Sequence, residues 1–162
     1  MNKIEQMAYN WINHYNAKYY WNIRSRLTDK DDSTSKVVKR YWLFRLKLME
    51  SYNNASLGTY INRGAIFEGT PILPHGLRGI HITDKAHIGK NCTIFQQTVI
   101  GVKYLNGGGP IIGDNCLIGA GAMVLGEVRI GNNVVIGANC VVDFDVPDNT
   151  TVVGQKPRII RK

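Results

Sequence analysis

Residues Ile112 to Val141 read IGDNCL, IGAGAM, VLGEVR, IGNNVV and IGANCV, five consecutive blocks of six. Each block begins with Ile or Val, usually followed by Gly, and its fifth residue is small. A period of six fits neither an isolated α-helix nor the two-residue alternation of an ordinary sheet, but it is typical of a solenoid whose short strands turn at fixed intervals. Three blocks make one triangular coil of about 18 residues, with Gly or Asn at corners where positive φ costs little. The pattern predicts a mainly β fold, a left-handed parallel β-helix.

The repeat extends toward the N-terminus with two interruptions. One run of blocks starts at Ile61 and another at Ile82, and residues 79–81 between them are out of register. Three extra residues in a solenoid must bulge out or be absorbed at a corner. After Ile100 the irregular stretch GVKYLNGGGPI follows. We expect this stretch to leave the coil as a loop over about residues 102–111.

The composition divides the chain into two parts. All 17 glycines lie at or after Gly58, whereas ten of the fifteen aromatic residues fall within residues 1–57. We therefore expect a helical cap over residues 1–57 and a β-helix over residues 58–162, with a C-terminal tail over 148–162.

The cap is expected to contain two helices. Apolar residues recur in it at helical spacing, at Ile4, Met7, Trp11 and Tyr15 and, after the polar stretch 28–35, at Val38, Tyr41, Trp42, Leu46 and Met49. Such helices would cover the open N-terminal end of the solenoid, which repeat proteins must cap. The alternative for a basic, aromatic helical surface is peripheral contact with a membrane.

The bulk composition excludes several classes of protein. With 44% hydrophobic and 20% charged residues, the chain of 162 residues is globular in composition, not disordered. It has neither an apolar run long enough to span a bilayer nor an apolar signal core at its start, so a cytoplasmic location is expected. The net charge of +8 suits nucleic acid, an anionic membrane or a phosphate-bearing ligand. No nucleic-acid-binding motif accompanies the charge, so no nucleic acid partner is expected.

The cysteines and histidines offer no metal site by spacing. Cys92, Cys116 and Cys140 each occupy the small fifth position of a block, 24 residues apart. Because 24 is not a multiple of one coil, we expect them on different faces, as buried reduced thiols. His75, His81 and His87 are six residues apart and are expected on different faces as well.

The glycine-bearing part resembles the hexapeptide-repeat acyltransferases. The resemblance is carried, in order, by LPHGLRG around His75, by IFQQTVIG, by the interrupted stretch, by IGAGA and by the ending VPDNTTVVGQKPRII. It covers residues 59–160. Within the family, the chain is most similar to serine acetyltransferases and to relatives that O-acetylate sugars of surface polysaccharides. The resemblance implies transfer of an acetyl group from acetyl-CoA, as co-substrate, to an acceptor hydroxyl, with no metal ion required.

The resemblance places the catalytic histidine of the family at His75. A free hydroxyl has a pKa far above 7, so its attack on the thioester needs a base, and imidazole titrates in the useful range. Two positions depart from the serine acetyltransferase pattern. Tyr60 stands where an Asp orients the catalytic imidazole, and Gly109 stands where a second His helps to hold the amino acid. The base is then held by a backbone carbonyl, by the Tyr60 hydroxyl or by Glu68.

The two departures make a sugar hydroxyl the expected acceptor and serine the alternative. Two further alternatives are a β-helix scaffold without activity and a zinc-dependent lyase resembling the β-helix carbonic anhydrases. The coenzyme A contacts implied by the resemblance are Gly101, Lys103, Ala120, Ala122, Lys156 and Arg158. A coenzyme A groove between neighbouring solenoids implies a homotrimer with three equivalent sites.

Overall fold

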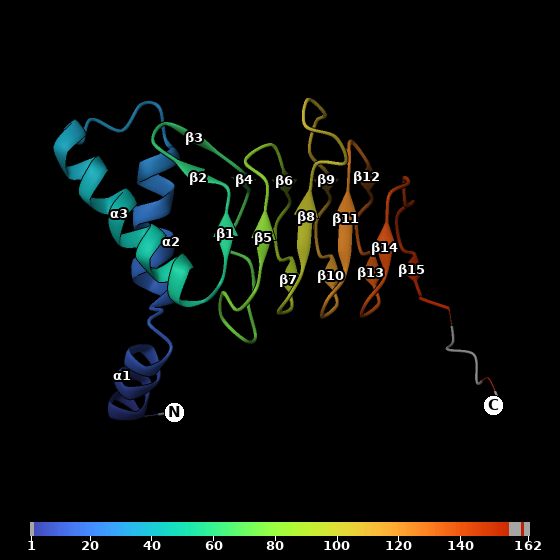
Figure 1. Ribbon diagram of the computed structural model, residues 1–162, viewed down its shortest axis with the longest axis horizontal. Helices are drawn as coiled ribbons and strands as arrows, with labels where there is room; N and C mark the ends of the chain where they lie inside the picture. The colour runs from blue at the N-terminus through green and yellow to red at the C-terminus, as the bar shows by residue number, and fades with distance from the viewer. Residues whose placement is uncertain (1, 156–159, 161–162) are drawn as a thin grey trace.

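The computed structural model describes residues 2–155 and 160, and in it three helices precede a prism of short strands (Figure 1). The helices are α1 (Lys3–Ile12), α2 (Ala17–Thr28) and α3 (Lys36–Tyr52). The expectation of two helices was therefore wrong in number. His14 takes a positive φ of 48°, and the side chain of Asn16 accepts a hydrogen bond from the Tyr19 amide and so caps a new helix.

The strands form three parallel sheets, which are the three faces of the prism (Figure 1). The first face contains β1 (Ser56–Leu57), β5 (His81–Ile82), β8 (Val99–Gly101), β11 (Met123–Leu125) and β14 (Val141–Val142). The second face contains β4 (Ile66–Phe67), β6 (His87–Ile88), β9 (Ile111–Ile112) and β12 (Arg129–Ile130). The third face contains β7 (Thr93–Ile94), β10 (Leu117–Ile118), β13 (Val135–Ile136) and β15 (Thr151–Val152). The predicted β-helix is confirmed, and its first coil also carries a small antiparallel hairpin of β2 (Thr59–Tyr60) and β3 (Arg63–Gly64).

The strand pairing shows how the coil absorbs its irregularities. Leu117 pairs with Val135, eighteen positions later, as three blocks of six require. Thr93 pairs with Leu117, twenty-four positions later, because the chain between β8 and β9 leaves the coil as a loop. Ile66 pairs with His87, twenty-one positions later, so the three extra residues lie in the turn that precedes β5.

This change of register corrects the placement of the cysteines. Cys92 and Cys116 immediately precede the paired residues Thr93 and Leu117, so they lie on the same face in adjacent coils. Cys140 precedes β14 on another face. All three thiols are free and buried as expected, and the hydrogen bond with the Cys116 thiol, together with burial, raises the pKa of Cys92. The expectation of three different faces was wrong because six of the residues between Cys92 and Cys116 lie in the loop and not in the coil.

The inward positions fill the prism with aliphatic side chains. The fully buried ones include Ile88, Ile94, Ile100, Ile112, Ile118 and Ile136. Burial of one such side chain contributes about 1.5–3 kcal/mol relative to leaving it in water. The repeated Ile or Val at the head of each block is therefore the residue that holds successive coils together.

We name the corners by the faces that they join. The first corner joins the first and second faces, the second corner joins the second and third, and the third corner joins the third and first. The second corner carries a ladder of Asn91, Asn115, Asn133 and Asn149, all with left-handed φ between 55° and 58°. Each Nδ2 donates to the next Oδ1, at 3.2, 3.2 and 2.9 Å along the ladder. Asn suits this backbone because its short polar side chain tolerates the left-handed region and bonds locally.

Helices α2 and α3 cover the N-terminal end of the prism (Figure 1). Tyr20, Leu27 and Leu46 are completely buried between these helices and the first coil. The Tyr20 hydroxyl donates to Glu50 Oε1 at 2.6 Å, and burial raises the pKa of Tyr20 well above its usual value. Together these contacts seal the open end of the coil.

Helix α1 does not take part in this covering layer. Its residues Ile4, Met7 and Trp11, which we expected in the cap, are 65–79% exposed, and only Tyr15 beyond its end is buried. Peripheral contact of this surface with a membrane stays a prediction. Among residues 2–155 and 160, no helix is long and apolar enough to cross a bilayer.

Candidate active site

His75 lies on an exposed turn where the coil is irregular. The turn covers residues 74–79, after the bridge that pairs Ile72 with Thr93 and before β5. Gly76 has a φ of +65° and donates its N–H to Leu73 O at 3.0 Å. Leu77 is completely buried and anchors the turn. The three extra residues thus present the histidine to solvent.

The His75 ring has few contacts of its own. Its centroid lies 6.1 Å from that of Phe95 in the next coil, and in the described part of the chain no hydrogen bond to the ring is found. Glu68, which we considered as a partner, instead places Oε1 2.7 Å from Nε2 of His87. The imidazole is therefore free to accept a proton from a bound hydroxyl.

Tyr60, the other side chain considered as a partner, lies on the hairpin at the first corner. Its ring lies 5.5 Å from Lys47 Nζ and 4.8 Å from the Arg63 guanidinium carbon. The His75 turn belongs to the third corner, where Gln97 N donates to Arg78 O. Within one chain, Tyr60 is thus at the opposite edge of the first face from His75.

Ala120 lies in the same column of turns as the His75 turn. Gly121 N donates to Gln96 O, and Asn139 N donates to Ala120 O, so the third corner stacks from coil to coil. The side-chain oxygen of Gln96 is buried there without a hydrogen-bond partner among the described residues. The third corner therefore holds both His75 and an acceptor atom that the folded chain leaves unused.

Ala122 is buried beneath this corner. Its side chain is completely inaccessible, its N–H donates to Gly119 O at 3.1 Å, and its carbonyl accepts from Val99 N at 3.0 Å. The backbone N–H and carbonyl of Ala122 are thus both hydrogen-bonded within the coil, at the position where a coenzyme A contact was predicted.

Gly101 and Lys103 lie at the first corner. Gly101 O accepts from Gly126 N at 2.9 Å, and Lys103 Nζ forms an ion pair with Asp143 at 2.9 Å. The hydrogen bond to Asp143 raises the pKa of Lys103 and lowers that of its carboxylate partner. A single chain therefore places His75 and these two residues at different corners of the prism. The predicted contacts Lys156 and Arg158 lie outside the described residues.

The loop between β8 and β9 has a backbone that excludes a side chain at its end. A Cβ atom added at Gly109 would lie 2.6 Å from the backbone of Lys85. Lys85 Nζ donates to Gly107 O, and Gly108 N donates to Glu127. The packing of the loop against Lys85 therefore leaves no room for a side chain at residue 109, the position that the resemblance matched to the second family histidine.

Within one described chain, the histidines are not brought together into a metal centre. His81 lies on the first face, His87 on the second, and His75 on its turn. Across the described ranges, no group of three His, Cys, Asp or Glu side chains is arranged to hold a metal ion.

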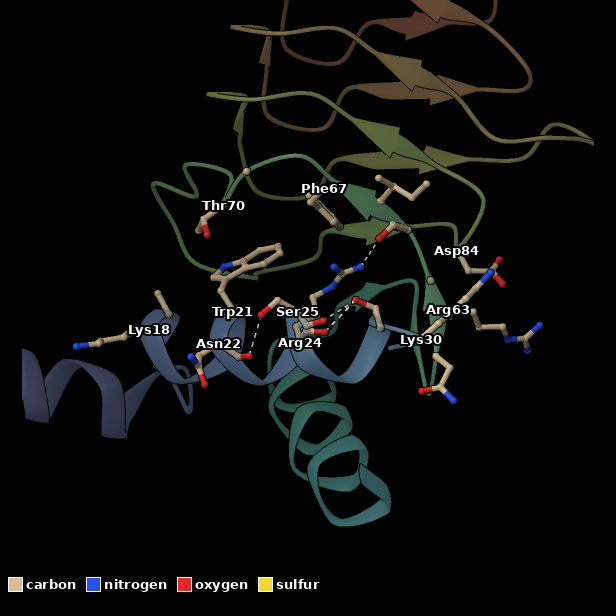
Figure 2. Close-up of a pocket in the computed structure, with 17 residues that line it drawn as sticks. Lys18, Trp21, Asn22, Arg24, Ser25, Lys30, Arg63, Phe67, Thr70 and Asp84 are labelled. Atoms are coloured by element: carbon tan, nitrogen blue, oxygen red, sulfur yellow. Dashed lines mark hydrogen bonds between the residues drawn. The ribbon is translucent and has the colours of Figure 1, made fainter. Parts of the chain in front are cut away.

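Sequence reasoning missed a groove between α2 and the first coil. It is lined by residues of α2 such as Trp21 and Arg24, by Lys30, by residues 62–67, 69 and 70, and by Asp84 (Figure 2). The signal available in the sequence was a second polar and aromatic face on residues 17–28, which we treated only as part of the cap. His75 does not line this groove.

Similarity to known proteins agrees with the coil and its turns. The family described as "Bacterial transferase hexapeptide (six repeats)" matches residues 109–143. A serine acetyltransferase of Bacillus subtilis is 36% identical over 126 residues, which are 76% of this chain and 58% of that protein. Serine acetyltransferase isoform 3 of Entamoeba histolytica, solved in complex with cysteine, superposes with a TM-score of 0.64 at 32% identity, over 76% of this chain and 43% of that one. A truncated serine acetyltransferase apoenzyme shares the fold, with a TM-score of 0.68 at 23% identity over 90% of this chain and 59% of that one.

Residues 109–143 match the hexapeptide-repeat transferase family, and the chain is similar to a serine acetyltransferase over 76% of its length. The relative and the solved structures reported above are named serine acetyltransferases. The chain spans less than three fifths of the length of the Bacillus subtilis protein, at 58%.

Proposed function

We propose that this protein transfers an acetyl group from acetyl-CoA to an acceptor hydroxyl, with His75 as the general base. The observation that carries the proposal is the position of His75. It stands on an exposed turn at the place where the repeat is broken, in a chain whose relatives are named acetyltransferases. Interruptions of a regular scaffold are where binding and catalytic residues concentrate.

In the proposed reaction, the imidazole takes the proton of the acceptor hydroxyl as its oxygen attacks the thioester carbonyl. The tetrahedral intermediate carries a negative oxygen, which backbone N–H donors at a coil corner would stabilise. The C–S bond then breaks, and the imidazolium returns the proton to the coenzyme A thiolate. No step requires a metal ion.

We further propose that the site forms between copies of the chain in a homotrimer. His75 and Ala120 lie at the third corner, whereas Gly101 and Lys103 lie at the first corner. Copies arranged about a threefold axis would place the third corner of one prism beside the first corner of the next. Coenzyme A would then lie in the shared groove, with Lys156 and Arg158 as the proposed contacts for its phosphates.

Serine is the acceptor that the relatives favour, because those reported above are named serine acetyltransferases. This reverses the order expected from the sequence, in which a sugar hydroxyl came first. The sugar hydroxyl is the second candidate, and Gly109 favours it. Since no side chain fits on the backbone at that position, the second family histidine has no equivalent there.

The deciding experiment measures thiol release from acetyl-CoA with the full chain and two sets of acceptors, L-serine and a panel of sugars. Turnover with serine that His75→Ala abolishes would support the first candidate. Turnover with a sugar alone would support the second. Release of thiol at the same rate in wild type and His75→Ala, with every acceptor, would contradict the assignment of the base. Sedimentation of the same sample tests the trimer.

A further inference from the structure

A groove of about 1000 Å³ lies between α2 and the segment around β3 and β4 (Figure 2). Its size suits a small-molecule ligand. Trp21 and Arg24 rise from α2 toward Phe67 in its centre, Lys18 lies at one end, and Lys30, Arg63 and Asp84 lie at the other, as Figure 2 shows.

Arg24 forms the centre of the groove as a buried cation. It is 3% exposed, its Nε donates to Thr59 Oγ1 at 3.1 Å, and its Nη2 donates to Leu57 O and Ala65 O at 3.2 and 2.7 Å. Among residues 2–155 and 160, no hydrogen bond from Nη1 is found and no carboxylate forms an ion pair with this guanidinium. Burial lowers the pKa of Arg24, yet a guanidinium stays charged at neutral pH.

Glu50 is the carboxylate whose charge acts on Arg24, and it has other hydrogen-bond and ion-pair partners. Glu50 accepts from the Tyr20 hydroxyl and forms an ion pair with Lys47 at 2.8 Å. Arg24 therefore has no ion-pair partner among the described residues, and the two N–H donors of its Nη1 have no hydrogen bond in the lining of the groove.

The rest of the lining adds charge of the same sign. Lys18, Lys30 and Arg63 are exposed around the groove, and Asp84 is the only carboxylate in its lining. Neither the three cations nor Asp84 takes part in an ion pair within the described ranges. With Arg24, the lining holds four cations. Four cations against one carboxylate favour an anionic ligand, and a phosphate group, which can carry two negative charges, suits both the guanidinium donors and the surrounding lysines.

An aromatic wall completes the groove. The rings of Trp21 and Phe67 meet edge to face with centroids 5.0 Å apart, and the Arg24 guanidinium lies 4.4 Å from the Phe67 centroid. Both side chains are half-buried, and the parts of the rings that Arg24 leaves uncovered can pack against the flat apolar face of a sugar or a base. Asp84 and the hydroxyls of Ser25 and Thr70 can accept hydrogen bonds from a ligand's own hydroxyl groups.

We propose that this groove binds a phosphorylated sugar, free or joined to a nucleotide, at a site separate from that of coenzyme A. The proposed coenzyme A contacts Lys103 and Ala120 lie in later coils and do not line the groove. The groove is still connected to the His75 turn. Trp21 Nε1 donates to the Tyr15 hydroxyl at 3.0 Å, and a Cβ added at Gly76 would lie 3.3 Å from the Tyr15 ring.

The test is a calorimetric titration of the full chain with inorganic pyrophosphate, glucose 1-phosphate, UDP-glucose and neutral glucose. We expect the three phosphate-bearing probes to bind and neutral glucose to bind more weakly. The double variant Lys18→Gln with Arg63→Gln removes one charge from each end and should weaken phosphate binding about tenfold. A matched control, Lys36→Gln with Arg129→Gln, changes the same residue types at exposed positions outside the groove and should bind as wild type does.

Several outcomes would overturn the proposal. These are no binding of any phosphate-bearing probe at millimolar concentration, equal affinities in the groove variant and its control, or complete displacement of UDP-glucose by coenzyme A. Arg24→Gln should also abolish binding, but that change can unfold the cap, so the exposed double variant decides. Because binding is measured without acetyl transfer, a failure here is distinct from a failure of the proposed reaction.

Discussion

The second and third corners of the same prism differ in what they do with their polar groups. At the second corner, the ladder from Asn91 to Asn149 pairs its side-chain amides from coil to coil. At the N-terminal end of the third corner, the His75 ring has no hydrogen bond in the described chain, and Gln96 Oε1 is buried without one. The regular corner thus pairs its side-chain amides with one another. The corner next to the three extra residues leaves polar side-chain atoms without hydrogen bonds in the described chain. The candidate chemistry lies at the latter corner.

The largest effect that would sharpen this contrast is on activity. His75→Ala should lower kcat for acetyl transfer by about 10² to 10⁴-fold, because the hydroxyl then has no base. The thermal midpoint should not change, since the ring is exposed and makes no hydrogen bond in the described chain. Thiol-release kinetics and a thermal melt on the same preparation measure both. A loss of folding together with activity would mean that the turn is structural.

The second effect concerns the interior that both corners share. Ile118 is completely buried at the head of a block, and Ile118→Ala should lower the free energy of unfolding by about 3 kcal/mol. Urea titration followed by circular dichroism measures this loss. An effect no larger than that of a surface substitution would contradict the role given to the inward positions.

The third effect is a dependence on pH beneath the His75 turn. Burial raises the pKa of Tyr15 to about 12 from a usual value of 10.0. Above pH 10 the unfolded chain loses this proton while the folded chain keeps it, so stability falls as the pH rises from about 10 to 12, by about 2–3 kcal/mol from this group. Urea titrations across this range, compared between wild type and Tyr15→Phe, measure the effect. Parallel curves for the two proteins would exclude Tyr15 as the source.

The smallest effect tests the asparagine ladder. Asn133→Ala should cost about 1 kcal/mol of stability, because alanine is disfavoured at a φ of 55° and removes two side-chain hydrogen bonds. Activity per folded molecule should stay at the wild-type value. Asn133→Gly, which relieves the backbone but not the lost amide, should be less destabilised. A lower kcat in either variant would contradict the prediction that the second corner affects stability alone.

The sequence predicted the regular part of this molecule well because each block repeats one physical requirement, an aliphatic residue inside and a permissive residue at the corner. The faces of Cys92 and Cys116 could not be predicted in this way. They depend on how many residues leave the coil in the loop between them, and the repeat pattern does not give that number. The helix count failed at His14 and Asn16, where one positive φ and one side-chain cap divided an apparently continuous pattern. The groove around Arg24 depends on contacts with Leu57 and Ala65, thirty-three and forty-one residues away, which no local pattern encodes.

The packing of Gly109 against Lys85 also limits how this chain can change over evolutionary time. A single codon change to histidine at this position would set a side chain against backbone atoms that cannot move aside alone. The loop would first have to be rebuilt, with its contacts to Lys85 and Glu127 released. Under the proposed function, a change of acceptor made through residue 109 therefore requires a change of the whole loop.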